Sequence, residues 1–191
     1  MKRINHFYVA ALMAVLFVFA VVSVEAQDKP RKSPKASVSQ RIGADTDIVI
    51  DYSRPAVNGR TVWGDLVPYG MNEGNKYSKD KPYPWRAGAN ENTTISFSKA
   101  VKINGQSIPA GKYGVHMLPG KSEFKIMFNS VNDSWGSYAY DASKDVLTVS
   151  VKPVSSDNTE WLEYGFEDLS ESGATAYLKW EKMKIPFKIE L

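Results

Sequence analysis

Hydrophobic and polar residues alternate in short segments along most of the chain. Ile48, Ile50 and Tyr52 place three apolar side chains on one face of an extended segment. This period of two is typical of half-buried strands, and it recurs around Ile95 and Phe97, Tyr113 to Met117, Phe124 to Phe128, Leu147 to Val151, Leu162 to Phe166, Ala174 to Trp180 and Ile185 to Ile189. No helical period persists over several turns. The pattern predicts an all-β fold, an antiparallel β-sandwich of jelly-roll or immunoglobulin-like type with about nine or ten strands.

Turn-forming residues separate these segments. Asn58-Gly59 and Asn104-Gly105 favour type I′ turns, so we expect a hairpin at each. Residues 71–84 have no apolar period and contain two prolines, which predicts a long exposed loop. Tyr138 and Tyr140 alternate with small residues and predict a further strand.

The N-terminal segment has the order of features found in secretory signal peptides. Lys2-Arg3 is followed by an apolar run from about Phe7 to Val24, and Val24-Glu25-Ala26 has the small-x-small character of a cleavage site. A single membrane anchor is the alternative, but the run is slightly short for about 30 Å of hydrocarbon and no basic cluster follows it directly. We therefore expect an exported protein, periplasmic or secreted, with no transmembrane segment after cleavage. The expected organisation is a signal peptide over 1–26, a flexible linker over 27–35 and one β-sandwich domain over 36–191, with an inserted loop over 71–84.

Charge and composition exclude several classes of function. The net charge is +3, and removing Lys2, Arg3 and Glu25 with the leader leaves 3 − 2 + 1 = +2, too little for a nucleic-acid surface. The chain has no cysteine, which excludes disulfides, a thiol nucleophile and cysteine-based zinc sites. Only His116 remains once His6 leaves with the leader, so a serine–histidine mechanism would have to use it. We expect no metal site and no cofactor.

A short polar and aromatic stretch is the predicted working surface. Trp85-Arg86-Ala87-Gly88-Ala89-Asn90-Glu91 places a large aromatic, a guanidinium, an amide and a carboxylate around small residues. Arginine can hold a carboxylate or phosphate with two parallel hydrogen bonds, and tryptophan offers a flat face to a sugar ring or a cation. With similar residues upstream, the predicted ligand-binding set is Arg54, Arg60, Trp63, Trp85, Arg86, Asn90 and Glu91. The alternative is that these arginines pair with acids to tie the loops together while the tryptophans cap the core.

Catalytic candidates are fewer. Glu91, Asp51 and Asp141 are the acids near the other motifs, and a pair of them could serve glycoside chemistry if the fold brought two together. Trp135, Tyr138 and Tyr140 could line a carbohydrate platform or simply be ordinary strand residues. His116 shares a segment with core residues but points to the other face, and we expect it to face solvent or to bond to a loop.

Several motifs together resemble the DUF2911 family, an exported family of unknown function common in Bacteroidetes. They include Ser39-Gln40-Arg41-Ile42-Gly43, Asp51-Tyr52-Ser53-Arg54-Pro55, Trp63-Gly64, Val67-Pro68-Tyr69-Gly70, Trp85 to Glu91, Ile108 to Tyr113, Trp135-Gly136 and Tyr138-Ala139-Tyr140-Asp141. The resemblance spans most of the chain from about Ser33 and implies an exported single-domain β-sandwich. In similar proteins the Val-Pro-Tyr-Gly segment runs almost directly into Trp-Arg, so residues 71–84 are an insertion that either separates Tyr69 from Trp85 or forms a lid.

These observations favour a non-catalytic binding or interaction module. Its partner would be a polar small molecule, a glycan or an envelope protein. A hydrolase acting on a saccharide or similar substrate through a carboxylate acid or base is the first alternative. A structural protein of the cell envelope is the second.

Overall fold

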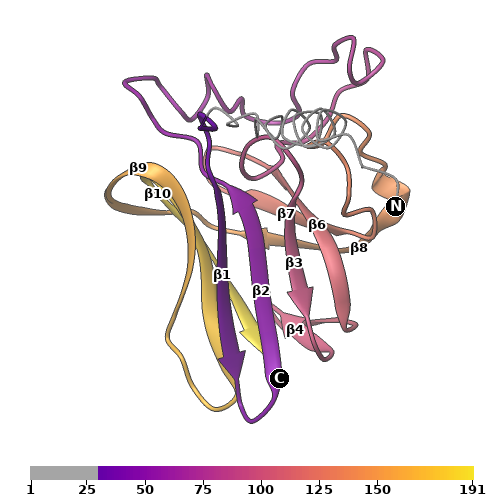
Figure 1. Cartoon of the computed structure of the whole chain (residues 1–191), viewed down its shortest axis with the longest axis vertical. Helices are drawn as coiled ribbons and strands as arrows, with labels where there is room; N and C mark the ends of the chain where they lie inside the picture. Colours follow the sequence, from indigo (N-terminus) through magenta and orange to yellow (C-terminus); the bar gives the residue numbers. More distant parts are fainter. Residues whose placement is uncertain (1–29) are drawn as a thin grey trace, which may run out of the picture. The chain divides into compact units, whose positions relative to one another are not determined.

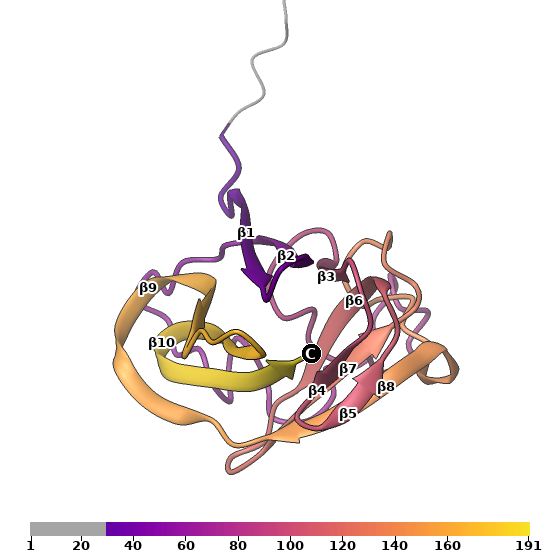
Figure 2. The ribbon, with the colours of Figure 1, turned by 90° about the horizontal axis from the view of Figure 1, so that it is seen from below.

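Two antiparallel sheets make up the part of the chain that the computed structural model describes, residues 30–191. The expected signal peptide, 1–26, lies outside these residues. One sheet has six strands in the order β1-β2-β3-β6-β7-β8, and the other has four in the order β5-β4-β10-β9 (Figures 1 and 2). The bounds are β1 Lys35–Ile42, β2 Thr46–Ser53, β3 Thr93–Phe97, β4 Val101–Ile103, β5 Gln106–Ile108, β6 Gly111–Leu118, β7 Phe124–Asn129, β8 Asp145–Val151, β9 Val154–Glu167 and β10 Gly173–Glu190, with one 3-10 turn, η1, at Ala142–Lys144. The predicted β-sandwich is confirmed.

Alternating residues of both sheets form one core. Ile48 and Ile50 of β2, Ile95 of β3 and Ile126 of β7 are each at most 1% exposed, as is Leu178 of β10 in the other sheet. The residues between them face outward, as expected of strands in which successive side chains point to opposite faces. Most core positions inferred from the alternation are therefore buried as predicted, while Leu147 and Phe166 are only partly buried against the core.

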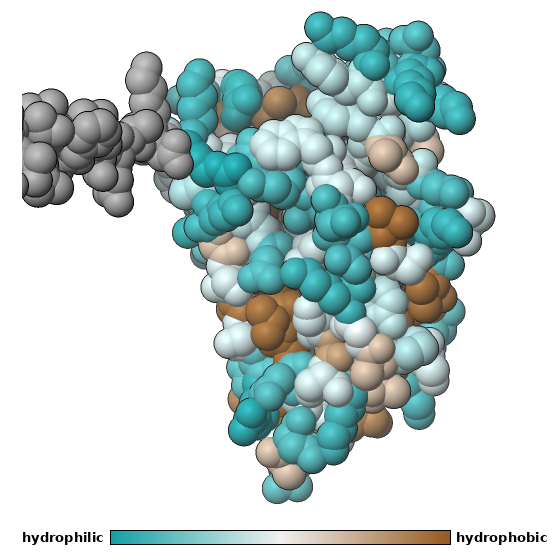
Figure 3. All heavy atoms as spheres, turned by 45° about the vertical axis from the view of Figure 1, so that its right-hand side comes forward, coloured by the Kyte–Doolittle hydropathy of each residue, from teal (hydrophilic) through white to brown (hydrophobic). Residues whose placement is uncertain are grey.

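Ring contacts join the two sheets. The rings of Phe128 on β7 and Phe187 on β10 lie 6.2 Å apart in an edge-to-face arrangement. Such pairs contribute beyond their buried area. On the face shown in Figure 3, hydrophilic residues cover most of the surface and hydrophobic residues form small separate patches.

Three expectations about elements need correction. The segments around Ala174–Trp180 and Ile185–Ile189 are one strand, β10, because two register shifts against β9 near Glu181, whose φ is +54°, let it bend without ending. Tyr138 and Tyr140 lie in a series of turns instead of a strand.

The third correction concerns one of the two predicted hairpins. Asn58-Gly59 has the positive φ angles of a type I′ turn, and the Arg60 amide donates to the Val57 carbonyl, yet no named strand flanks it. The hairpin at Asn104-Gly105 is confirmed, joining β4 to β5.

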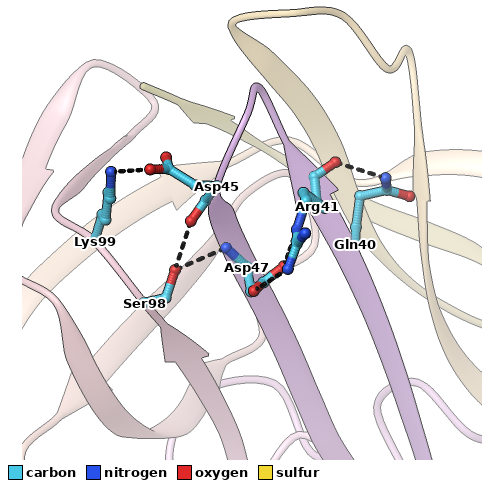
Figure 4. Close-up of polar contacts among 6 residues, drawn as sticks. All are labelled: Gln40, Arg41, Asp45, Asp47, Ser98 and Lys99. Carbon is cyan, nitrogen blue, oxygen red and sulfur yellow. Dashed lines mark hydrogen bonds and ion pairs between the residues drawn. The ribbon is translucent and has the colours of Figure 1, made fainter.

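Ion pairs occupy the turn between β1 and β2 (Figure 4). Arg41 donates two hydrogen bonds to the carboxylate of Asp47, at 2.7 and 2.8 Å, across the two strands. Lys99 lies 2.5 Å from Asp45, and the Ser98 hydroxyl accepts from the Asp47 amide. These groups are exposed, so the pairs contribute little to stability.

The opposite end of β2 leads into the loops (Figure 1). Residues 54–92 join β2 to β3 without a named strand. Within them Asn72 and Tyr83 pair through both backbone amides, at 2.8 and 3.2 Å, which closes the base of the predicted inserted loop. No helix in residues 30–191 is long and apolar enough to cross a membrane.

Candidate functional site

A pocket of about 870 Å³ lies among these loops, and we call it the loop-end pocket. Its volume is within the range of about 300–1,000 Å³ that small-molecule sites have. Four of the predicted binding residues line it: Arg60, Trp85, Arg86 and Asn90. The other three, Arg54, Trp63 and Glu91, do not.

The segment from Trp85 to Asn90 forms one wall and is held by backbone contacts. Trp85 pairs with Met117 of β6 through both amides, at 2.9 and 2.8 Å. The Ala87 carbonyl accepts from the hydroxyls of Thr93 and Tyr164, at 3.1 and 2.9 Å. At Gly88 a Cβ would lie 2.7 Å from the Thr93 hydroxyl, so only glycine fits there. The small residues therefore serve close packing and leave the larger ones to line the pocket.

Arg86 is half-buried on this wall. It donates to the Asn90 carbonyl at 2.7 Å, and its guanidinium carbon lies 4.8 Å from the centre of the Tyr138 ring. Its guanidinium also packs against Gly136, where a Cβ would come within 2.2 Å of it. Arg86 thus links the Trp85–Asn90 wall to the turns after β7.

The second wall is the loop from Pro55 to Arg60 and the middle of β9. The Val57 amide donates to the Glu160 carbonyl at 2.8 Å, and Ala56 pairs with Trp161. Arg60 in turn donates to the Ala56 and Val57 carbonyls, at 2.6 and 3.0 Å. These contacts hold its guanidinium beside β9, a strand far along the chain.

Arg54 does not line the pocket and instead contacts β9 of the other sheet. It donates to the Leu162 carbonyl at 2.8 Å and lies 3.6 Å from the Glu163 carboxylate. Both partners belong to β9, so Arg54 joins the end of β2 to the other sheet. This matches the loop-tying alternative for this one arginine.

Four aromatic rings form the floor beneath the pocket. Trp63 contacts Trp85, Phe124 and Trp180 edge-on, with ring centres 5.5–6.0 Å apart, and Trp85 stacks on Trp180 at 6.1 Å. Trp180 lines the pocket and is 1% exposed. The indole N–H groups of Trp63 and Trp180 have no hydrogen-bond partner among the described residues. A buried donor without an acceptor is costly, and of these two residues only Trp180 also lines the pocket.

Asn90 and Glu91 are neighbours in sequence but line different hollows. The Asn90 amide donates to the Ser33 carbonyl at 3.2 Å, and φ is +59° at this residue. Glu91 instead lines a second hollow of about 620 Å³ over β1, β2 and β3, which we call the β1–β3 hollow. The predicted seven-residue site is therefore divided at this point.

The β1–β3 hollow contains two of the three catalytic candidates. Asp51 and Glu91 both line it. The Lys112 ammonium lies 3.8 Å from Asp51, and the Lys35 ammonium lies 3.5 Å from Glu91. The third candidate, Asp141, lies outside this hollow and caps η1, where its carboxylate accepts from the Ser143 amide at 2.9 Å. That bond lowers the pKa of Asp141, as expected of an N-cap.

His116 is buried at 3% exposure on the outer face of β6. Its Nδ1 lies 2.6 Å from the Ser137 hydroxyl, and its ring faces Tyr140 at 5.0 Å. The bond to a loop is as expected, but the exposure to solvent is not, because the turns at 136–140 cover this face. Burial, together with the nearby charge of Arg86, lowers the pKa of His116 to about 4. Ser137 is itself 1% exposed, so this serine–histidine pair is closed to a substrate.

The predicted aromatic platform does not form as a unit. Tyr138 lines the loop-end pocket and contacts Tyr77 and Tyr83 of the loop 71–84, with ring centres 5.5 and 5.0 Å apart. Trp135 is 56% exposed and does not line the pocket. Tyr140 faces His116 and donates to Asp145. Burial, together with the hydrogen bond to Asp145 and its charge, raises the pKa of Tyr140.

Sequence reasoning missed several lining residues, chiefly Glu160, Trp161 and Trp180. The alternation of β10 assigns Trp180 to the core, and Trp180 is indeed buried. Trp161 alternates with the apolar positions of β9, so the sequence places this large aromatic residue on the outer face, which is the one signal that could have marked it as a binding residue.

Among residues 30–191, no three His, Cys, Asp or Glu side chains gather as a metal site would require.

Comparisons with known proteins identify a family for this chain. No curated protein and no solved structure matches the chain. Residues 33–189 match a family described as "Protein of unknown function (DUF2911)". The chain, a two-sheet β-sandwich with this loop-end pocket, therefore belongs to the DUF2911 family.

Proposed function

We propose that this protein is an exported, non-catalytic binding module that takes a small polar ligand in the loop-end pocket. The observation that carries the proposal is the pocket itself, which Arg60 and Arg86 line together with Trp180 and the exposed Trp161. Convergent polar groups within an aromatic lining are the usual composition of a ligand site.

The test is a ligand screen on the purified protein and on a rim variant. Trp161 is 41% exposed, so Trp161→Ala should leave the fold intact. We expect a compound that raises the melting temperature of the wild type to lose at least tenfold in affinity on this variant. A screen of sugars, carboxylic acids and phosphorylated metabolites in which no compound distinguishes the two proteins would contradict the proposal.

Arg86→Ala is a less informative variant than the sequence suggests. Arg86 supports Asn90 and Tyr138 as well as lining the pocket, so its removal disturbs the wall. Arg60→Gln is preferable because Arg60 is exposed and bonds only within its own loop.

Export is supported by the N-terminal sequence pattern. Expression of the complete chain in a bacterial host, followed by cell fractionation and mass measurement, tests it. We expect the exported form to begin near Gln27. Recovery of the uncleaved chain with the membranes would favour the anchor alternative.

A hydrolase at the β1–β3 hollow is the second candidate, because Asp51 and Glu91 line the same hollow. Ion pairs to lysine hold both carboxylates, which places this candidate behind the binding module. It predicts cleavage of chromogenic glycosides that Asp51→Asn or Glu91→Gln reduces at least a hundredfold. Equal rates in the wild type and both variants would remove it.

A further inference from the structure

We infer that the ligand of the loop-end pocket is a pyranose that carries a carboxylate, a hexuronate-type sugar. This inference rests on the proposed function and adds the class of ligand. Three properties of the pocket lead to it: its charge, its guanidinium N–H groups without acceptors, and the combination of an exposed aromatic residue with amide side chains.

The charge of the lining favours an anion. Lys32, Arg60 and Arg86 are its cations and Glu160 is its one acid, which gives 3 − 1 = +2. The Glu160 carboxylate already accepts from the Asn58 amide at 2.8 Å. Glu160 is therefore hydrogen-bonded within its own wall of the pocket. The three cations form no ion pair with a carboxylate of the described residues.

Several hydrogen-bond donors in the same lining have no acceptor among the described residues. A guanidinium has five N–H groups, of which Arg60 uses two and Arg86 uses one in bonds to backbone carbonyls. Those bonds fix each guanidinium before a ligand arrives, which reduces the entropy cost of binding. The Trp180 indole adds a buried donor without an acceptor. A carboxylate supplies acceptor oxygens and the opposite charge together.

The remaining lining suits a hydroxylated ring. Trp161 presents an aromatic face that is 41% exposed, and Tyr138 lies on the opposite wall. The electron-rich face of an aromatic ring attracts the C–H groups of a pyranose. Three amide side chains, of Asn58, Asn72 and Asn90, also line the pocket. Asn72 and Asn90 each donate one N–H to a backbone carbonyl, and an amide has a second N–H and an oxygen that can still bond to a ligand. Ring hydroxyls can use both, whereas a simple aromatic acid has no hydroxyl groups to bond to them.

The experiment uses the tryptophan indole N–H signals of the 15N-labelled protein as reporters. The chain has five tryptophans, so five signals are expected, assigned by Trp→Phe substitution. We expect D-glucuronate or D-galacturonate to shift the signals of Trp161 and Trp180. Trp135 lies outside the pocket and serves as the internal control. D-glucose, acetate and benzoate, titrated in parallel, should bind at least tenfold more weakly than the uronates.

Arg60→Gln should weaken uronate binding at least tenfold. The matched control is Arg41→Gln, which removes an exposed arginine of β1 beside the β1–β2 turn (Figure 4) and should change the affinity less than twofold. Heteronuclear spectra of both variants establish that they are folded.

Each other outcome overturns the inference in a distinguishable way. Glucose binding as tightly as glucuronate would show that charge is not recognised. Equal binding of benzoate or acetate would show that the sugar ring is not recognised. If no uronate moves the Trp161 and Trp180 signals while another small polar compound does, the uronate inference fails and the proposed binding function stands. If no compound of the broad screen moves them, both fail.

Discussion

Arg54, Arg60 and Arg86 carry the same group, yet their surroundings separate them. Arg54 bonds to β9 and faces an acid, while Arg60 and Arg86 bond to backbone carbonyls within the loops and keep further N–H groups toward the pocket. A guanidinium whose charge meets no carboxylate is the more informative sign of a ligand. The sequence alone could not make this distinction, because the acceptors of Arg54 lie on a strand more than a hundred residues away.

Gly136→Ala and Gly59→Ala form a matched pair at this scale. Both glycines have left-handed backbone, with φ of +65° and +69°, so an alanine costs about 1 kcal/mol at either. A Cβ at Gly59 meets nothing within 4 Å, whereas at Gly136 it meets the Arg86 guanidinium. We expect Gly136→Ala to be less stable by about a further 2 kcal/mol, since Arg86 must move away from Asn90 and Tyr138. Urea denaturation of both variants measures the difference, and equal stabilities would show that Arg86 is not held there.

His116 predicts a pH dependence of stability. Its pKa is about 4 in the folded protein, against about 6.5 when unfolded. Between these values the unfolded chain binds a proton that the folded chain does not, so stability falls as pH falls from about 6.5 toward 4, by up to about 3 kcal/mol. Urea denaturation at pH 7, 5.5 and 4.5 should show this loss in the wild type.

His116→Gln is the control for that dependence. Glutamine keeps an amide that can bond to Ser137 but does not titrate. Burial raises the pKa of Asp145, which gives an opposing pH dependence, but Asp145 is present in both proteins and cancels in the comparison. An identical pH profile for the two proteins would contradict the assignment to His116.

At the scale of elements, local alternation predicts the strands well because each strand buries one face. It fails where burial arises from loops. Tyr138 and Tyr140 alternate as strand residues do, but they face different neighbours across turns, the inserted loop and His116. The bend in β10 also escaped prediction, since a register shift depends on the partner strand and leaves the apolar period on either side unchanged.

The candidate site was predictable only in part for the same reason. Trp85 to Asn90 could be chosen because its residue types are adjacent in sequence. The opposite wall requires residues 55–60 and 160–161 to meet, and no local pattern encodes that pairing. Glu91 shows the converse, because it is adjacent to Asn90 in sequence but lines the β1–β3 hollow, while Asn90 lines the loop-end pocket.

The inserted loop should be removable beyond its paired base. Replacing residues 73–82 with Asn-Gly leaves Asn72 and Tyr83 joined by a two-residue turn. The replacement removes the ring pair of Tyr77 and Tyr138 and the hydrogen bond from the Asn75 amide to the Tyr83 hydroxyl, so we expect stability to fall by about 1–2 kcal/mol. Tyr77→Ala is the control that removes the ring alone. Thermal denaturation compares the two, and failure of the shortened chain to fold would show that the loop supports the sandwich.

At the scale of the whole described domain, its two ends differ in chemistry. The β1–β2 turn carries exposed ion pairs (Figure 4). The loop-end pocket carries cations without a carboxylate partner among the described residues, and two buried indole N–H groups nearby have no acceptor there. Both ends are fixed by the same core, since Trp85 and Trp180 stack beneath the pocket and belong to the cluster that fills the sandwich. A substitution that destabilises the core should therefore also disturb the loop-end pocket, whereas a substitution in the β1–β2 turn should not.

Phe187→Ala tests whether the loop end and the sandwich unfold as one unit. Phe187 is 3% exposed and contacts Phe128 across the sandwich, so the truncation should cost about 3–5 kcal/mol. Val154→Ala, at a residue 44% exposed, is the control and should cost within about 0.5 kcal/mol. Because the aromatic floor of the pocket shares this core, we expect the tryptophan near-UV signal and the far-UV strand signal of Phe187→Ala to disappear at the same urea concentration. Disappearance of the tryptophan signal at a lower concentration would mean that the loop end unfolds independently of the sandwich, and the pocket would then depend on its own contacts rather than on the core.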